Sequence, residues 1–328
     1  MARGPDVIGA VIVPACRACL RALVTRRPRV GRAERLLRAL LLLPPFGFVL
    51  VVLRLRLLVA GPLVVDGVTD DGVRLRCRLP DLIQMYVHLF GCWEPDLAAF
   101  LRRRLRPGDW FVDVGANIGC MTALAARAVG PEGRVVAIEC SPAVLVELRE
   151  TLTRNRLANV RLVESAASDR REELTLFAGP SHNVGLTATV SHRGLQAQGK
   201  VMAAPLGDLV TADELARARL VKIDVEGAED RVLAGMLPVL DGLSAAAEIV
   251  VELSPTWWTD AGRRPIDVLQ PFLDRGFHVY VLPNDYWPWR YLWPDDVGAP
   301  RRLRDLSLLA RRMPRLDVVL SRLDRDAL

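Results

Sequence analysis

The 328-residue sequence has few of the features that mark specialised protein classes. It has no internal repeat and no low-complexity tract, and its balance of apolar and charged residues excludes a fibrous or disordered chain. Six scattered cysteines indicate free thiols rather than a disulfide framework. The single Cys16-Arg-Ala-Cys19 has no second pair and no nearby histidine, so we assign no metal ligands. A chain of this length is expected to hold one α/β domain with flanking segments.

Lysine is scarce, since only Lys200 and Lys222 contribute to the 44 basic residues. Eleven arginines lie within residues 1–61, where they face only Asp6 and Glu34, so this segment is more positive than the whole chain, whose net charge is +6. Part of this enrichment is what a GC-rich genome encodes. A basic, apolar arm nevertheless favours contact with an anionic membrane surface through residues 1–60, and we expect no nucleic-acid partner.

The apolar part of this arm is short for a membrane span. The uncharged run Ala39–Leu53 has fewer than the ~20 residues that a helix needs to cross the hydrocarbon, and Pro44-Pro45 removes two amide donors near its middle. We therefore favour an interfacial or docked helix–turn–helix over a spanning helix. Arg17 and Arg21 interrupt the early apolar stretch, which argues against a cleaved signal peptide. The expected location is cytoplasmic, with membrane association through the arm.

The pattern of apolar residues divides the chain into four parts. Residues 1–61 form the arm, residues 62–108 a β-hairpin and helix lead-in, residues 109–285 a doubly wound α/β domain, and residues 286–328 a tail of amphipathic helices. In the lead-in, apolar residues from Val73 to Leu79 alternate with arginines, which predicts a strand with a solvated basic face.

Short apolar runs alternate with helical patterns in the α/β domain, which is typical of a parallel sheet. We expect strands at Trp110–Val114, Val135–Ile138, Val160–Val163, Leu220–Ile223, Glu248–Val251 and His278–Leu282. We expect helices at Ile118–Val129, Pro142–Asn155, Glu229–Leu237 and Pro265–Arg275. Residues 172–206 form an excursion with strand-like alternation.

Two of the three glycines of the dinucleotide-binding fingerprint are missing from the first turn of this domain. Phe111–Gly119 places an acid near the end of an apolar strand and a glycine-bearing turn before a helix, so backbone amides can approach a ligand closely. The fingerprint requires glycine at the first, third and sixth positions. Gly115 occupies the first position, but Asn117 and Cys120 occupy the third and sixth. The spacing therefore favours S-adenosylmethionine (SAM), whose nucleoside and amino-acid parts need no phosphate cradle.

Glu139 ends the second expected strand, roughly twenty residues beyond the turn. A carboxylate at this position can accept both ribose hydroxyl protons. NAD-binding and SAM-binding folds share this feature, so Glu139 indicates a ribose-bearing cofactor without choosing between the two.

Motifs spread along the chain resemble those of the FkbM-type SAM-dependent methyltransferases. They are Gly91–Pro95, Phe111–Gly119, Glu139–Pro142, Ala166–Asp169, Asn183–Gly185, Lys222–Glu229 and Glu252–Pro255. The resemblance runs from about Val65 to Leu282, and its most specific part is the Lys-Ile-Asp-Val-Glu-Gly-Ala-Glu run. Ile138 and Cys140 depart from the usual aromatic residue and proline that flank the glutamate.

The resemblance implies a Rossmann-like SAM methyltransferase sheet, SAM as the methyl donor, and a small-molecule or glycan acceptor. Transfer to a hydroxyl oxygen of a sugar, polyketide or other secondary metabolite is expected. Asp113 would orient the ammonium end of the methionine moiety through water or backbone, and Ala166 and Ala167 follow the third strand, where related enzymes hold the adenine. The cofactor-binding positions are Asp113, Gly115, Ala116, Asn117, Gly119, Glu139, Ala166 and Ala167.

The catalytic candidates lie at the ends of the fourth and fifth strands, where doubly wound folds place their active crevice. Methyl transfer requires alignment of the acceptor and removal of its proton. Asp224 and Glu226 are candidates for the base or an orienting group, and Glu252, His182 and His192 stand behind them. An alternative is that Lys222 pairs with Asp224 in a structural ion pair.

Two alternatives from other functional classes stay open at this point. An NAD(P)-binding oxidoreductase is disfavoured by Asn117 and Cys120. A degenerate member of the family would bind SAM, or nothing, and serve as an interaction module. No oligomeric state is assigned.

Overall fold

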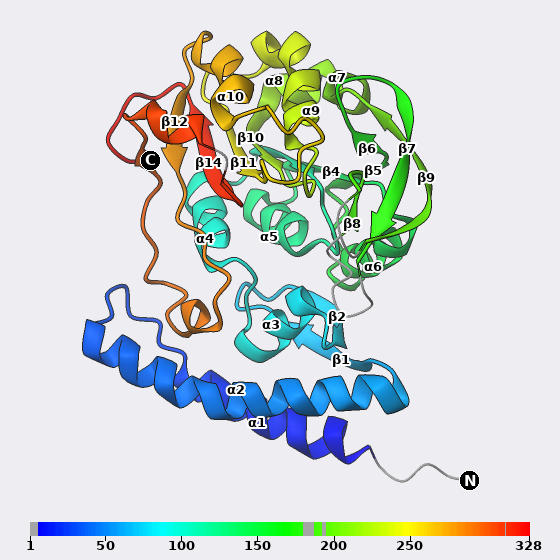
Figure 1. Ribbon diagram of the computed structural model, residues 1–328, viewed down its shortest axis with the longest axis vertical. Coiled ribbons are helices and arrows are strands. Elements are labelled where there is room, and N and C mark those ends of the chain that lie inside the picture. Colours follow the sequence, from blue (N-terminus) through cyan, green and yellow to red (C-terminus); the bar gives the residue numbers. More distant parts are fainter. Residues whose placement is uncertain (1–5, 180–186, 192–194, 312) are drawn as a thin grey trace. The chain divides into compact units, whose positions relative to one another are not determined.

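The computed structural model describes residues 6–179, 187–191, 195–311 and 313–328. The chain forms two compact units (Figure 1). The described residues of 1–99 and 284–298 make up the first unit, and those of 100–283 and 299–328 make up the second.

Helices dominate the first unit, and the predicted β-hairpin is confirmed within it. Its strands β1 (Leu63–Val68) and β2 (Arg74–Leu79) are antiparallel. Side chains along β2 alternate between exposed and buried, so its arginines form the solvated face that the sequence predicts. The helices of the unit are η1 (Ile8–Ile12), α1 (Val13–Leu23), α2 (Arg32–Ala60), α3 (Leu82–Phe90), the start of α4 (Pro95–Arg104) and η3 (Pro288–Leu292).

The predicted break at Pro44-Pro45 is wrong, because α2 runs without interruption through both prolines. Proline deprives a helix of amide donors, but packing of an apolar face supplies most of a helix's stability in a folded protein. Leu42, Phe46 and Val49 bury one side of α2 on both sides of the proline pair. The arm is thus one long helix preceded by a short one.

Helix α3 was not predicted from the sequence because it is buried on almost every side. Buried residues run consecutively from Gln84 to Phe90, so no 3.6-residue period is visible. Its boundaries follow common capping rules. The Asp81 carboxylate accepts the Gln84 amide at 3.1 Å, and Gly91 ends the helix in a left-handed conformation.

An eight-stranded sheet forms the centre of the second unit, in the order β13-β12-β14-β11-β10-β3-β4-β5. All six predicted strands are confirmed. They are β3 (Trp110–Val114), β4 (Arg134–Glu139), β5 (Val160–Glu164), β10 (Ala218–Ile223), β11 (Glu248–Leu253) and β12 (His278–Val281). The chain runs outward from β3 to β5 and returns to add β10 on the other side of β3, which is the doubly wound arrangement predicted.

Helices cover both faces of this sheet (Figure 1). One face packs on α9 (Glu229–Met236) and α10 (Pro265–Leu273), and on the other face α5 (Cys120–Val129) and α6 (Pro142–Arg154) pack near β3 and β4. Each of these helices was predicted to within two residues at either end. The remaining short helices are α7 (Leu206–Leu209), α8 (Ala212–Arg217) and η2 (Leu237–Gly242).

The excursion after β5 forms a smaller sheet in the order β6-β9-β7-β8. Its strands are β6 (Ala166–Ala167), β7 (Glu172–Ala178), β8 (Thr187–Ala188) and β9 (Gln196–Ala204). The long antiparallel pair β7–β9 confirms the strand-like alternation seen in the sequence.

The prediction of a helical tail over residues 286–328 is wrong. β14 (Leu316–Ser321) inserts antiparallel between β11 and β12 in the central sheet, β13 (Arg301–Arg302) pairs with β12, and the one helix after residue 299 is the short η4 (Leu306–Ala310), within the described residues. A strand inside a sheet is buried on both faces, so it appears as a continuous apolar run. In a leucine- and arginine-rich tail such a run resembles one side of a helix.

Candidate functional site

The turn after β3 packs against the ends of two neighbouring strands. Gly115 has a φ of +80°, and a Cβ at this position would lie 1.8 Å from the carbonyl oxygen of Asp224. The amides of Gly115 and Ala116 both donate to the Ile138 carbonyl at 3.0 Å. Only glycine fits at position 115, because any side chain would push the turn away from β10.

Two further residues of the turn adopt left-handed conformations and direct the chain into α5. Asn117 has a φ of +51°, and its side-chain oxygen accepts the Ile118 amide at 2.7 Å. Gly119 has a φ of +89°, and a Cβ there would lie 2.6 Å from a methyl group of Leu148 on α6. The amino end of α5 therefore begins at the turn, at the carboxyl edge of the sheet.

Glu139 joins this turn to the loop after β4. One carboxylate oxygen, Oε1, accepts the amides of Cys140 at 2.9 Å and Ser141 at 2.8 Å, and Oε2 accepts the Asn117 amide at 3.0 Å. Burial raises the pKa of this carboxyl group, while the three amide hydrogen bonds act to lower it. The carboxylate is thus held in one orientation, with acceptor capacity left on Oε2.

Lys222 connects β10, β3 and the turn. Its ammonium Nζ lies 3.3 Å from Asp113 Oδ1 and 3.2 Å from Asp224 Oδ2, and it donates to the Gly115 carbonyl at 3.2 Å. The predicted ion pair between Lys222 and Asp224 is confirmed. The other oxygen of Asp113 accepts the Thr122 hydroxyl at 2.6 Å.

Asp113 lies beneath the turn and has no exposed surface. Burial raises its pKa, and the adjacent Lys222 ammonium opposes that shift. A carboxylate in this place acts on a ligand only through the residues it holds. The expectation that Asp113 orients the ammonium end of the methionine moiety through water or backbone stays a prediction.

Asp224 lies at the end of β10, and its side chain is 29% exposed. Its amide donates to the Val114 carbonyl at 3.0 Å, which fixes its backbone beside β3. The structure therefore brings Asp224 next to Gly115 and presents part of its carboxylate at the sheet edge. Of the catalytic candidates, it has the closest connection to the turn.

The described glutamate candidates, Glu226 and Glu252, are less directly connected to the turn. Glu226 is partly exposed and has a left-handed φ of +52°. Lys222 lies beside Val250 in the register of β10 and β11, so Glu252 follows two residues later on the same face of the sheet. His182 and His192 lie outside the described residues.

Ala166 and Ala167 form β6 and are both buried. They pair with Ala203 and Ala204 of β9. The preceding residue, Ser165, donates its amide to the Glu139 carbonyl at 3.1 Å, so β6 begins beside the end of β4. Ala166 and Ala167 thus lie next to the end of β4, which Glu139 joins to the turn after β3.

A buried glutamate for which no role was predicted joins two loops at this edge of the sheet. Glu229 is the first residue of α9; its Oε1 accepts the Gly227 amide at 2.6 Å, and its Oε2 accepts the Trp258 indole at 2.9 Å and the Ser254 amide at 3.3 Å. Burial raises its pKa to about 7. Its position could have pointed to this role, because Glu229 is the last residue of the Lys222–Glu229 motif and the first residue of a predicted helix.

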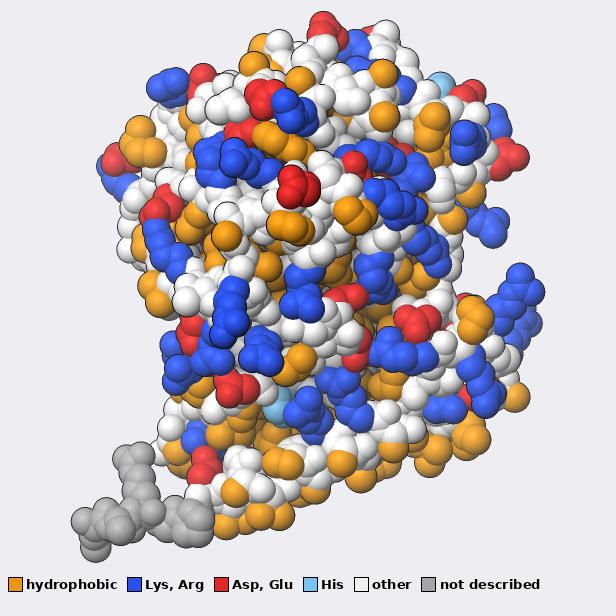
Figure 2. All heavy atoms as spheres, turned by 180° about the vertical axis from the view of Figure 1, so that it is seen from behind, with side chains coloured by type: hydrophobic (Ala, Val, Ile, Leu, Met, Phe, Trp, Pro, Cys, Tyr) orange, Lys and Arg blue, Asp and Glu red, His pale blue; other side chains and the backbone are white. Residues whose placement is uncertain are grey.

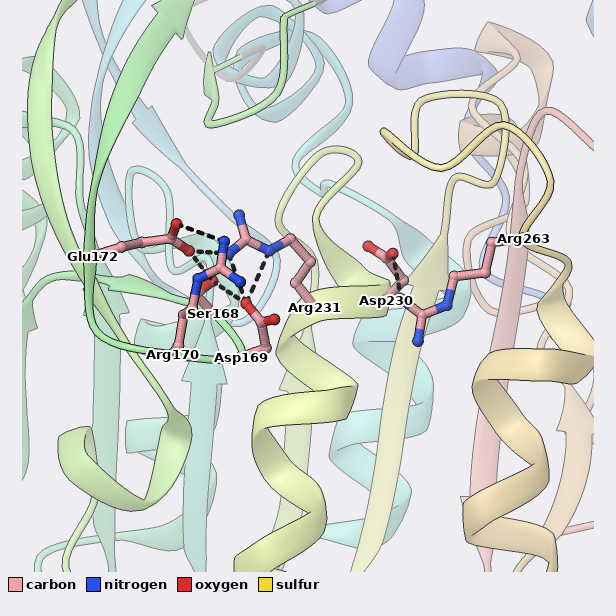
Figure 3. A network of polar contacts seen from close by, with 7 residues as sticks. All are labelled: Ser168, Asp169, Arg170, Glu172, Asp230, Arg231 and Arg263. Atoms are coloured by element: carbon pink, nitrogen blue, oxygen red, sulfur yellow. Dashed lines mark hydrogen bonds and ion pairs between the residues drawn. The ribbon is translucent and has the colours of Figure 1, made fainter.

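The next two residues of α9 form ion pairs in opposite directions (Figure 3). Asp230 pairs with Arg263 at 3.0 Å, and Arg231 pairs with Asp169 at 2.6 Å and also with Glu172. The first turn of α9 therefore fixes the loop after β11 on one side and the start of the β6–β7 excursion on the other.

A separate hollow lies at the opposite edge of the sheet. Trp110 and Arg134, which begin β3 and β4, line it together with Asn159 just before β5. Ligands of doubly wound folds bind at the carboxyl ends of the strands. We therefore place the functional site at the turn after β3 and not in this hollow.

Comparison with known proteins identifies a matching family. The model of the methyltransferase FkbM domain matches residues 113–279. The chain is 35% identical over 162 residues to the 31-O-demethyl-FK506 methyltransferase FkbM of Streptomyces tacrolimicus, which covers 40% of this chain and 61% of that protein. It is 33% identical over 70 residues to an arsenite methyltransferase of Halobacterium salinarum, covering 21% and 17% of the two chains. The chain thus spans less than two thirds of these curated relatives.

Solved structures of methyltransferases show more distant likeness. A precorrin-6y C5,15-methyltransferase from Geobacter metallireducens has a TM-score of 0.38 and 16% identity, over 69% of this chain and 86% of that one. TYW2 of M. jannaschii, in complex with AdoMet, has a TM-score of 0.40 and 13% identity, over 79% and 84%. Likeness at this level does not bear on function.

The close approach at Gly115 predicts a site-specific loss of stability. Gly115→Ala combines a left-handed φ with a backbone clash, and we expect its free energy of unfolding in a urea titration to fall well beyond the ~1–3 kcal/mol of conformational strain alone. Gly130→Ala is the matched control, because Gly130 has a φ of +68° and a Cβ added there would have no neighbour within 4 Å. Equal losses in the two variants would show that the turn does not need its contact with Asp224.

The raised pKa of Glu229 predicts a pH-dependent contribution to stability. Its pKa is about 7 in the folded chain against a reference of 4.5, so the native state binds this proton more tightly and stability falls as pH rises from about 4.5 through 7. We expect Glu229→Gln to remove up to about 3 kcal/mol of the difference in unfolding free energy between pH 5 and pH 8. Glu132→Gln, at an exposed turn residue, is the control. An unchanged pH dependence in Glu229→Gln would contradict the assignment.

Proposed function

Because the chain belongs to the FkbM methyltransferase domain family, we propose that it transfers a methyl group from SAM to a hydroxyl oxygen of a sugar, a polyketide or another secondary metabolite. The observation that carries the proposal is the position of Glu139, fixed at the end of β4 and bonded to the amide of Asn117 in the turn after β3. The name of the Streptomyces relative, which is that of a 31-O-demethyl-FK506 methyltransferase, supports a hydroxyl acceptor.

The residues at the turn fit SAM. Glycine at position 115 keeps the backbone free of side chains, and acceptor capacity on Glu139 Oε2 suits a ribose hydroxyl. Because Oε1 already accepts two amides, we assign one strong ribose hydrogen bond to Oε2 and a weaker, shared one to Oε1. Ala116, Asn117, Gly119, Ala166 and Ala167 complete the proposed cofactor site, and Asp113 supports it from beneath.

The chain's own groups supply alignment and proton transfer. SAM, when bound, supplies the electrophilic methyl group on its sulfonium. Asp224 has an exposed part of its carboxylate at the sheet edge, and the ion pair with Lys222 fixes its position. We assign Asp224 as the group that accepts the proton of the acceptor hydroxyl, and Glu226 as a group that orients the following loop. Glu252 and the two histidines of the excursion are the reserve candidates for the base.

We propose that the partner is a small-molecule or glycan acceptor and that the enzyme acts in the cytoplasm. Helix α2 is long and apolar enough to cross a membrane by length and composition alone. With its basic flanks, this supports association of residues 1–60 with an anionic membrane surface.

Loss of Glu139 is expected to weaken cofactor binding. Glu139→Ala removes the charge-assisted hydrogen bonds to the ribose, so the Kd for SAM in isothermal titration should rise by the equivalent of roughly 2–4 kcal/mol. The same change leaves three backbone amides without an acceptor and should also lower the melting temperature. Glu139→Gln, which keeps the shape of the side chain, provides a second variant.

The matched control is Glu164→Ala, since Glu164 lies beside Glu139 in the register of β4 and β5 and is exposed. It should bind SAM as the wild type does. A folded Glu139 variant with wild-type affinity would remove this residue from the site. Titration with NAD in the same series tests the oxidoreductase alternative, and tight binding of NAD without binding of SAM would overturn the proposal.

The role of Asp224 is tested by single-turnover methyl transfer. Asp224→Asn keeps the shape but removes the base, and should slow the chemical step by ~10²–10⁴-fold with little change in SAM affinity. Glu226→Gln should cost less if Glu226 only orients its loop. A near wild-type rate in folded Asp224→Asn would show that Asp224 serves only its ion pair with Lys222.

A further inference from the structure

The outward side of α2 is apolar along almost the whole helix. Ten large hydrophobic side chains between residues 36 and 59 are 51–85% exposed, and they all lie on one side of the helix. They are Leu36, Leu37, Leu40, Leu41, Leu43, Phe48, Val51, Leu55, Leu58 and Val59. Figure 2 shows hydrophobic side chains gathered along the lower edge of the view, where α2 lies. At 1.5 Å per residue this apolar side is about 35 Å long.

The opposite side of α2 packs on its own unit. Leu42, Phe46, Val49 and Leu53 are buried. The Phe46 ring lies 6.0 Å from the ring of Tyr86 and 5.9 Å from that of Phe90, both on α3. The orientation of the helix about its axis is therefore fixed by packing within the first unit.

The charged residues of α2 are mostly directed away from the apolar side. Arg38 pairs with Glu34 at 2.8 Å and donates to the Leu23 carbonyl, Arg56 pairs with Asp6 at 2.9 Å, and Arg35 pairs with Asp296. A surface helix of a water-soluble protein has apolar residues inward and charged residues outward, whereas α2 is apolar on both of these sides. The outward side of α2 thus has the composition of a buried surface.

Basic residues gather beside this apolar side. Arg27, Arg29 and Arg32 precede or begin the helix and are exposed, and Arg54 is exposed near its end, whereas Arg26 pairs with Asp70 and Asp295 of its own unit. Arginine contacts phosphate through two parallel hydrogen bonds. An apolar strip bordered by exposed arginines is complementary to a surface with a hydrocarbon interior and anionic headgroups.

We propose that α2 lies in the plane of an anionic membrane, with its outward side inserted at the boundary between headgroups and acyl chains and with Arg27, Arg29 and Arg32 on the headgroup phosphates. This deepens the membrane association proposed above and does not depend on methyl transfer. A second copy of the chain is a poorer occupant, because it would bring the same exposed arginines against those that border the apolar strip, whereas anionic headgroups are complementary to them.

An in-plane helix fits the packing better than a spanning helix does. A span would carry the elements that cover the inward side, α1 and α3, into the hydrocarbon together with the attached hairpin. The exposed face of β2 carries Arg74, Arg76 and Arg78, whose burial in lipid is costly. If α2 lies in the plane of the membrane, only its outward side is buried in lipid, and α1, α3 and the hairpin stay in water.

Vesicle binding tests the surface. Full-length protein should co-sediment with vesicles of phosphatidylglycerol and phosphatidylcholine, and less with phosphatidylcholine alone. The triple variant Leu40→Glu, Val51→Glu, Leu58→Glu places charge along the middle of the outward side, and should bind these vesicles roughly 100-fold more weakly. Because these side chains are exposed, the variant should fold and bind SAM as the wild type does.

The control is the double variant Val146→Glu, Met202→Glu, which changes exposed hydrophobic residues of the second unit. It should bind vesicles as the wild type does. Equal vesicle binding by the triple variant would overturn the proposal. A wild-type dimer that ignores vesicles and dissociates in the triple variant would assign the surface to a second copy. If the wild-type protein binds vesicles but does not bind SAM, that result would contradict the proposed function and leave the membrane proposal standing.

Depth measurements separate the in-plane helix from a span. Spin labels at Leu40→Cys, Val51→Cys and Leu58→Cys should report the same shallow depth with lipid-phase and aqueous relaxation agents. Each label is placed in a background in which Cys19, Cys120 and Cys140, the thiols that are not buried, are replaced by serine. A spanning helix would instead give depths that differ across the bilayer, since residues 40 and 58 are about 27 Å apart along the axis. That outcome would overturn the in-plane orientation.

Discussion

The structure at the carboxyl edge of the sheet depends on one buried ammonium group and the carboxylates that neutralise its charge. Lys222 lies between carboxylates from β3 and from the end of β10 and also donates to the carbonyl of Gly115. A buried charge is tolerated only where its partners are close and well oriented. The ends of β3 and β10, and the glycine turn between them, therefore have to stay in register. The point at which the strand order reverses is held together by this cluster.

Two buried glutamates extend this arrangement to the neighbouring strands. Glu139 collects amides from the turn and from the loop after β4, and Glu229 collects donors from the loops after β10 and β11. Each carboxylate satisfies backbone groups that would otherwise be buried without partners. The ion pairs of Asp230 and Arg231 add the loops on either side of α9 (Figure 3). Loops that are usually adaptable are thus fixed before any ligand binds, which lowers the entropic cost of binding.

The sequence predicted those parts of the fold that follow a simple period. The parallel strands and their helices have regular apolar patterns, and the spacing of Gly115, Asn117 and Cys120 separated SAM from a dinucleotide. Elements whose stability comes from tertiary packing were not predictable in this way. Helix α2 continues through Pro44-Pro45 because its inward side is buried, and β14 is buried along almost its whole length because it lies inside the sheet. Glu229 was missed for a related reason, since its donors come from loops distant in the sequence.

The lysine at position 222 is an exception in a chain whose basic residues are almost all arginine. Only two of the 44 basic residues are lysines, so arginine is the usual cation of this chain. At position 222, however, the three acceptors, Asp113 Oδ1, Asp224 Oδ2 and the Gly115 carbonyl, surround a single nitrogen. An ammonium group has three donors on one atom, whereas a guanidinium spreads five donors over a planar fork. The geometry of the cluster therefore favours lysine over arginine where β3 and β10 end, although arginine is far more common in the rest of the chain.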